Sequence, residues 1–113
     1  MYVLVCYVPG SHKEAVKQAM FAAGAGVMDS YACCCWETCG RGQFLPLEGS
    51  EPYLGRQGRL EYVDEWRLEL VVDEEHATNV VRAMREAHPY EVPAYHLIPV
   101  LTFEDVPDEI EEY

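Results

Sequence analysis

Residues 8–23 read Val-Pro-Gly-Ser-His-Lys-Glu-Ala-Val-Lys-Gln-Ala-Met-Phe-Ala-Ala, and residues 72–87 repeat the pattern as Val-Asp-Glu-Glu-His-Ala-Thr-Asn-Val-Val-Arg-Ala-Met-Arg-Glu-Ala. Identical residues at matching places are Val8 and Val72, His12 and His76, Val16 and Val80, Ala19 and Ala83, Met20 and Met84, and Ala23 and Ala87. Each copy contains the end of an apolar run, then a turn, and then a segment with the pattern of an amphipathic helix. A strand–helix–strand unit that occurs twice predicts the order βαββαβ. We therefore expect a ferredoxin-like α+β sandwich, a four-stranded antiparallel sheet with two helices on one face.

Four segments have the composition of strands. Residues 2–8 are continuously apolar, and residues 60–72 alternate between apolar and polar side chains. Residues 31–39 are rich in aromatic and small apolar types, and we predict that they form the second strand. Residues 94–101 form the predicted last strand, where Pro99 indicates an edge position or a bulge.

Both predicted helices carry start and stop signals. Ser11 and Glu14 have the spacing of a capping box at the start of the first helix, and Gly24 ends it. Asp73 is a suitable N-cap for the second helix, and Pro89 prevents its continuation.

The 113 residues suffice for one domain, which we place at residues 1–102. Residues 40–58 contain five glycines and two prolines without a sustained period, so we expect a long arm between the second and third strands. Residues 103–113 are predicted to form an acidic C-terminal tail.

The charge and the cysteines limit the environment of the chain. Its net charge of -12 disfavours nucleic acids and anionic membranes as partners. The N-terminal run has no basic region or cleavage site of a signal peptide, and it is too short to span a bilayer. Five cysteines are an odd number and four of them are crowded, unlike a secreted disulfide scaffold. We expect reduced thiols and a cytoplasmic location.

The predicted sheet has one face without helices. The third strand places Glu65, Arg67 and Glu69 on this face, whereas the first and last strands contribute mostly apolar side chains. Apolar sheet surface needs cover, which favours a homo-oligomer.

The cysteines are the first candidates for chemistry. On a strand, Cys33, Cys35 and Cys39 would share one face, and thiolates are the ligands that zinc and copper(I) favour. Residues two apart on a strand are ~6.6 Å apart, too wide for a shared tetrahedral site. Packing as small hydrophobic side chains is the alternative that we favour.

The second candidate is the string His88-Pro-Tyr90-Glu91-Val-Pro-Ala-Tyr-His96. His88 and Glu91 are suitable ligands for a divalent metal, and Tyr90 is a suitable hydrogen-bond donor to a small anion. The alternative is a helix C-terminus, where His88 favours the negative end of the helix dipole and the prolines set the turn.

The third candidate is the arm. Arg41, Arg56 and Arg59 gather in and beside it, so it could bind an anion, or it could grip a neighbouring subunit. In a βαββαβ sheet the loop that starts at His88 should lie near the arm. Tyr31 should lie at the far edge, so a site that joins it to His88 needs two subunits. We find no convincing catalytic set.

Four spaced strings then resemble a known family. In order they are Tyr31-x-x-Cys34, Gly42-x-Phe44-x-Pro46-x-x-Gly49-x-x-Pro52-x-x-Gly55-x-x-Gly58, Glu61-x-x-x-Glu65-x-Arg67 and His88-Pro89-Tyr90-Glu91-x-Pro93-Ala94-Tyr95. Together they resemble the YqfO-type domain, a PII/CutA-like module found alone or inserted in Nif-three-like dinuclear metal centre proteins. The resemblance covers roughly residues 2–101.

The resemblance implies a trimer and a set of site residues. The candidate ligand-binding residues are Tyr31, Phe44, Arg67 and Tyr90, and the candidate metal ligands are His88, Glu91 and Cys34. Val92 replaces a second glutamate of the family string, and His96 replaces a common aspartate. The dinuclear metal ligands of the host proteins belong to a flanking domain that these 113 residues do not include.

Three functional hypotheses follow. The first is a trimeric binding or regulatory module with a small ligand or a divalent metal between its subunits. The second is a structural or protein-interaction domain in which the same residues fix loops. The third is an enzyme such as a phosphoester hydrolase.

Overall fold

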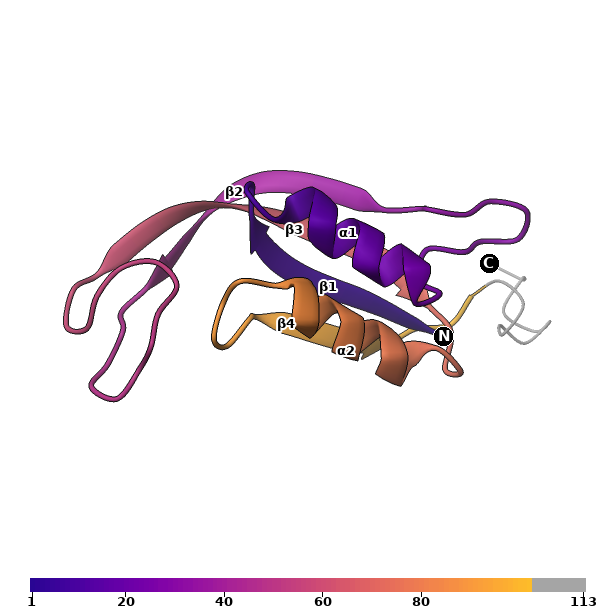
Figure 1. The fold of residues 1–113 in the computed structure, drawn as a ribbon. Coiled ribbons are helices and arrows are strands. Elements are labelled where there is room, and N and C mark those ends of the chain that lie inside the picture. The colour runs from indigo at the N-terminus through magenta and orange to yellow at the C-terminus, as the bar shows by residue number, and fades with distance from the viewer. Residues whose placement is uncertain (103–113) are drawn as a thin grey trace, which may run out of the picture.

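The computed structural model describes residues 1–102, and the predicted acidic tail lies outside them. The elements in chain order are β1 (Tyr2–Pro9), α1 (Lys13–Ala22), β2 (Trp36–Phe44), β3 (Glu61–Val72), α2 (Ala77–Ala87) and β4 (Tyr95–Pro99). The strands pair antiparallel in the order β2-β3-β1-β4, and both helices cover one face of the sheet (Figure 1). The predicted ferredoxin-like fold is confirmed, and Pro99 lies in an edge strand as expected.

The core lies between the helices and the two central strands. Val16 and Met20 of α1 and Val80 and Met84 of α2 are fully buried, and they are matched residues of the repeat. They face the alternate residues of β1 and β3 that are also buried, namely Leu4, Cys6, Val8, Leu68, Leu70 and Val72. The repeat therefore marks the apolar stripe of each helix, which explains why it identifies the fold.

The second strand begins later than predicted. Residues 31–35 are not a strand, since Tyr31 pairs only with Met28 in an isolated bridge and Cys33 has a φ of 57°. The aromatic and small apolar composition of these residues predicts a strand, but left-handed backbone interrupts one. β2 instead extends through residues 40–44, which were predicted as part of the arm. The predicted common face of Cys33, Cys35 and Cys39 is wrong, because Cys33 does not belong to a strand.

The start of α1 also differs from the prediction. Ser11 does not cap the helix, because its hydroxyl lies 2.8 Å from His12 Nδ1. Lys13 and Lys17 instead bind the two oxygens of Glu37 on β2, each at 2.9 Å. The bond from Lys13, and then that from Lys17, lowers the pKa of Glu37. α1 is thus held by side chains to the sheet, which the local capping pattern could not reveal. At α2 the N-cap is His76 and not the predicted Asp73, whose carboxylate accepts the backbone N–H of His76 at 2.9 Å in the turn before the helix.

The β2–β3 hairpin continues past the helices and makes the molecule elongated, with extents of 54 × 32 × 23 Å (Figure 1). We use the name arm for the outer part of this hairpin, which consists of residues 40–44 of β2, residues 45–60 that join the two strands, and the first residues of β3. Leu60, just before β3, and Tyr62 on its apolar side are exposed, because the arm has no helix above it.

Within residues 1–102, no helix combines the length and the apolar character needed to cross a membrane.

Candidate functional site

A cavity of about 410 Å³ lies where the arm meets the loop that follows α2. We call it the arm cavity. The arm supplies Gln43, Phe44, Leu45, Pro46, Leu47, Ser50 and Pro52, β3 supplies Glu65, and the loop supplies Tyr90, Glu91, Val92 and Ala94. The structure thus brings the His88–Glu91 loop next to the arm, as the topology predicted.

His88 anchors the loop to the sheet. Its side chain is 6% exposed, and Nε2 lies 2.6 Å from the carbonyl oxygen of Tyr7 on β1. Nδ1 accepts the backbone N–H of Tyr90 at 3.2 Å. A carbonyl must receive a proton and an N–H must give one, so the two bonds together specify the neutral tautomer with its proton on Nε2.

Burial lowers the pKa of His88, although the bond to Tyr7 and the charge of Glu65 oppose this effect. An ordinary histidine, as in the unfolded chain, titrates at about 6.5. The unfolded chain therefore binds the proton more readily, and neutral His88 contributes stability above about pH 6.5 that is lost as the pH falls toward the lower folded-state pKa.

We expect the destabilisation caused by His88→Ala to shrink as the pH falls below about 6.5. Urea denaturation of both proteins between about pH 8 and pH 5 measures this difference. His76→Ala is the control with the opposite sign. Its bond to Asp73 raises the pKa of His76, so that contribution is present at low pH and lost as the pH rises through the folded-state value. A His88→Ala difference that is constant with pH would contradict the assigned tautomer.

Tyr90 is the buried polar group of the arm cavity. Its hydroxyl oxygen is inaccessible and has no hydrogen bond of normal geometry within the described residues. Burial, and then the adjacent Glu65 carboxylate, raises the pKa of Tyr90. An unsatisfied buried hydroxyl costs about 1–3 kcal/mol, so a partner that accepts or donates a hydrogen bond here would be favoured.

The arm is fastened to the loop at the mouth of the cavity. The ring of Tyr53 lies between those of His12 and Tyr90, with centroid distances of 5.7 and 6.2 Å. The backbone N–H of Glu51 donates to the Glu91 carboxylate at 2.8 Å. These contacts join the arm to the N-cap residue of α1 and to the loop, and they hold the cavity walls together.

Arg67 lies beside the arm cavity, on the helix-free face of the sheet. It forms an ion pair with Glu69 at 2.9 Å and lines a groove that shares Glu65 and Ala94 with the cavity. The floor of this groove includes Gly40 and Gly42, which have no side chains to fill it. Arg67 is therefore placed to act next to the cavity rather than inside it.

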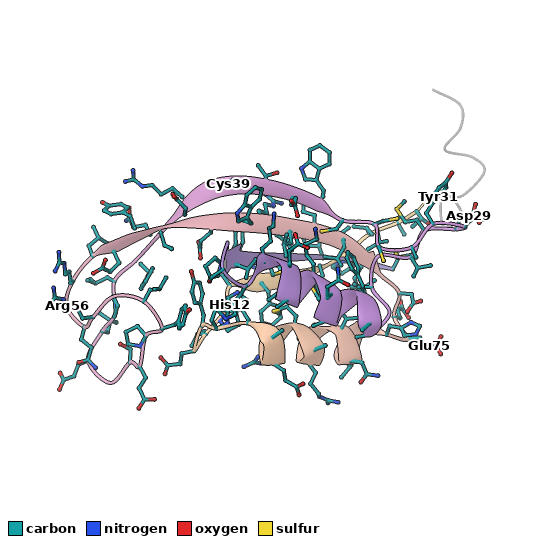
Figure 2. All side chains as sticks on the ribbon, turned by 45° about the horizontal axis from the view of Figure 1, so that its top comes forward. His12, Asp29, Tyr31, Cys39, Arg56 and Glu75 are labelled. Atoms are coloured by element: carbon teal, nitrogen blue, oxygen red, sulfur yellow. The ribbon has the colours of Figure 1, made fainter. Side chains whose placement is uncertain are left out.

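The other two predicted site residues lie elsewhere. Tyr31 is 74% exposed at the opposite end of the molecule from Arg56 at the arm tip (Figure 2). Cys34 lies near it, where its backbone N–H donates to Gly26 and its thiol contacts the Ala32 carbonyl at 3.8 Å. One chain therefore does not join Tyr31 and Cys34 to His88.

The predicted metal ligands do not form a centre within one chain. No group of three His, Cys, Asp or Glu side chains in residues 1–102 could hold a metal ion. Both ring nitrogens of His88 already have hydrogen-bond partners, so a metal would have to displace one of them. A metal bound between chains stays a prediction.

Glu65 and Tyr53 are site residues that were not predicted from the sequence. Glu65 was placed only on the helix-free face, although it stands in the same string as Arg67. Tyr53 lies in the arm, where no helical or strand periodicity of the sequence indicates which side chains face the site. The signal in the sequence that could have pointed to Glu65 is its place in the string Glu61-x-x-x-Glu65-x-Arg67, two residues from a candidate arginine.

No family model matches the chain. A curated relative from Halalkalibacterium halodurans, named GTP cyclohydrolase 1 type 2 homolog, is 44% identical over 100 residues, which cover 88% of this chain and 27% of the relative. The chain thus spans about a quarter of the length of the curated relatives that it matches.

Two solved structures show the same architecture. A Bacillus cereus protein related to NIF3 superposes with a TM-score of 0.77 at 37% identity, over 88% of this chain and 25% of that chain. The PII-like protein CutA from Nostoc superposes with a TM-score of 0.66 at 15% identity, over 98% of this chain and 91% of that chain, which shows the fold alone. The chain is therefore a relative of a segment of NIF3-related proteins with the CutA fold, and the predicted resemblance to the YqfO-type PII/CutA-like domain is confirmed.

Proposed function

We propose that the chain is a PII/CutA-like binding module of the cytoplasm that takes a small ligand in the arm cavity and assembles with copies of itself. The observation that carries the proposal is the arm cavity itself, whose walls are mainly apolar and whose buried Tyr90 hydroxyl lies beside the Glu65 carboxylate without a hydrogen bond of normal geometry within the described residues. Its volume of about 410 Å³ falls in the range of small-molecule sites, roughly 300–1,000 Å³.

His88 and Glu91 act as structural anchors in this proposal. Each already has a hydrogen-bond partner, and together they position the loop that carries Tyr90. For these two side chains we therefore favour the structural role of our second hypothesis, in which they hold the loop in place.

Assembly is supported by the helix-free face of the sheet. Trp36 is 69% exposed there, and Ile98 and Tyr7 lie on the same face. The exposed apolar side chains of this mixed face would be stabilised by cover from another copy. Native mass spectrometry is expected to show a trimer, and a monomer at micromolar concentration would contradict this part alone.

We expect Ala94→Leu to weaken ligand binding, because Ala94 is exposed and lines the cavity. The neutral probe N-phenyl-1-naphthylamine becomes fluorescent in apolar sites, and its titration should saturate for the wild-type chain. Ala94→Leu should weaken binding by roughly tenfold or more, since an extra side chain occupies the site.

Ala22→Leu is the matched control, because Ala22 is exposed at the end of α1 and does not line the cavity. It should bind the probe like the wild type. Equal binding by the wild type and Ala94→Leu would assign the probe to exposed apolar side chains and contradict the proposal.

A further inference from the structure

We infer that the arm cavity selects a ligand with an apolar body and one cationic amine or similar hydrogen-bond donor, and that it rejects phosphates and other anions. The inference rests on the proposed function and names the class of ligand for the same cavity. It follows from which charged groups line the walls and which do not.

Cations are missing from the described walls of the arm cavity, which contain no lysine or arginine. The three arginines that suggested an anion site lie elsewhere on the arm. Arg41 stacks over the ring of Tyr62 at 4.3 Å, Arg59 pairs with Glu61 at 3.6 Å, and Arg56 is at the tip (Figure 2). Arg67 lies in the neighbouring groove, where it pairs with Glu69 at 2.9 Å. An anion in the cavity would therefore find no charged donor in the cavity walls.

The polar groups of the walls suit a cation. Glu65 and Glu91 both line the cavity, and Glu65 forms no ion pair with a residue of the described chain. Partial burial of the Glu65 side chain strengthens its interaction with a ligand charge compared with an exposed carboxylate. The adjacent Tyr90 hydroxyl can accept a second hydrogen bond from an ammonium group.

Gly42 provides the space for the Glu65 side chain. A Cβ atom at Gly42 would collide with the end of that side chain, whereas one at Gly40 would meet nothing within 4 Å. The absence of a side chain at Gly42 thus lets the carboxylate lie at the border of the cavity. The net charge of -12 also raises the local concentration of cations around the chain.

Three probes with one apolar body separate the alternatives: phenylbutylamine, phenylbutanol and phenylbutyrate. Their affinities are measured by isothermal titration calorimetry, or by displacement of N-phenyl-1-naphthylamine. We expect the amine to bind roughly tenfold more tightly than the alcohol, since a charge-assisted hydrogen bond is stronger than a neutral one, and the acid to bind most weakly.

Glu65→Gln should reduce the preference for the amine to about the level of the alcohol. Asp64→Asn removes the same charge from a neighbouring exposed position outside the cavity, so it should keep the preference and control for the overall field. Gly42→Ala should also lower the preference by displacing the Glu65 side chain, and Gly40→Ala should not.

The outcomes distinguish this inference from the proposed function. Equal affinities for the three probes, or a preference for the acid, would overturn the inference and leave a binding cavity in place. An amine preference that survives Glu65→Gln would also overturn it, whatever the result for Asp64→Asn. Failure of all probes, including N-phenyl-1-naphthylamine, to bind would overturn the proposed function as well.

Discussion

Replacing His88 by alanine is expected to destabilise the chain by about 3 kcal/mol, because two separate losses combine at one buried position. The Tyr7 carbonyl loses the donor that lies 2.6 Å from it, and an unsatisfied buried acceptor costs about 1–3 kcal/mol. Removal of a buried ring also leaves a cavity under the loop. Urea denaturation followed by the fluorescence of the two tryptophans measures the effect.

The same experiment separates an anchor from a metal ligand. If His88 anchors the loop, the loss of stability should be the same with and without a chelator. Glu86→Ala, at an exposed position near the end of α2, should change stability by less than about 0.5 kcal/mol. A wild-type chain that becomes as unstable as His88→Ala after chelation would instead identify a bound metal.

Gly26→Ala is expected to have a similar or larger effect, about 3 kcal/mol or more. Gly26 has a φ of 76°, and a Cβ atom there would lie 2.7 Å from the carbonyl oxygen of Cys34. The backbone cannot move away easily, because the N–H of Gly26 donates to Val71 and its carbonyl accepts from Cys34, both at 2.8 Å. Strain in the left-handed region alone costs roughly 1–2 kcal/mol, and the clash adds to it.

Gly49→Ala is the matched control for this prediction. Gly49 has a φ of 92°, but a Cβ atom there would meet nothing within 4 Å. It should therefore show only the backbone strain, about 1 kcal/mol, in urea denaturation. Equal effects of the two substitutions would show that residues 26–35 tolerate rearrangement, contrary to their hydrogen bonds.

For much of the candidate site, the sequence predicted only which segments lie close together. The βαββαβ order places the loop at His88 and the arm at the same edge, and the structure confirms this with the bond between Glu51 and Glu91. The role of each side chain in the site could be assigned only from the tertiary structure. His88 was predicted as a metal ligand, yet its nitrogens are used by the backbone of Tyr7 and Tyr90, and a contact with a residue so distant in sequence has no local pattern.

The fold itself followed from periodicity, because the stripe of Val16, Met20, Val80 and Met84 has to be buried against apolar strands. Amino-acid composition was a weaker guide to secondary structure where the backbone conformation of single residues decides whether a strand can form. Residues 31–35 are apolar enough for a strand, but the left-handed Cys33 and the anchored Gly26 hold them in a loop. The sequence by itself therefore determined the order of elements and the core. The tertiary structure decided where β2 begins, which polar groups are already satisfied, and that Glu65 rather than an arginine borders the cavity. The reason is that burial patterns repeat locally along the chain, whereas hydrogen-bond partners and cavity walls come from segments distant in the sequence.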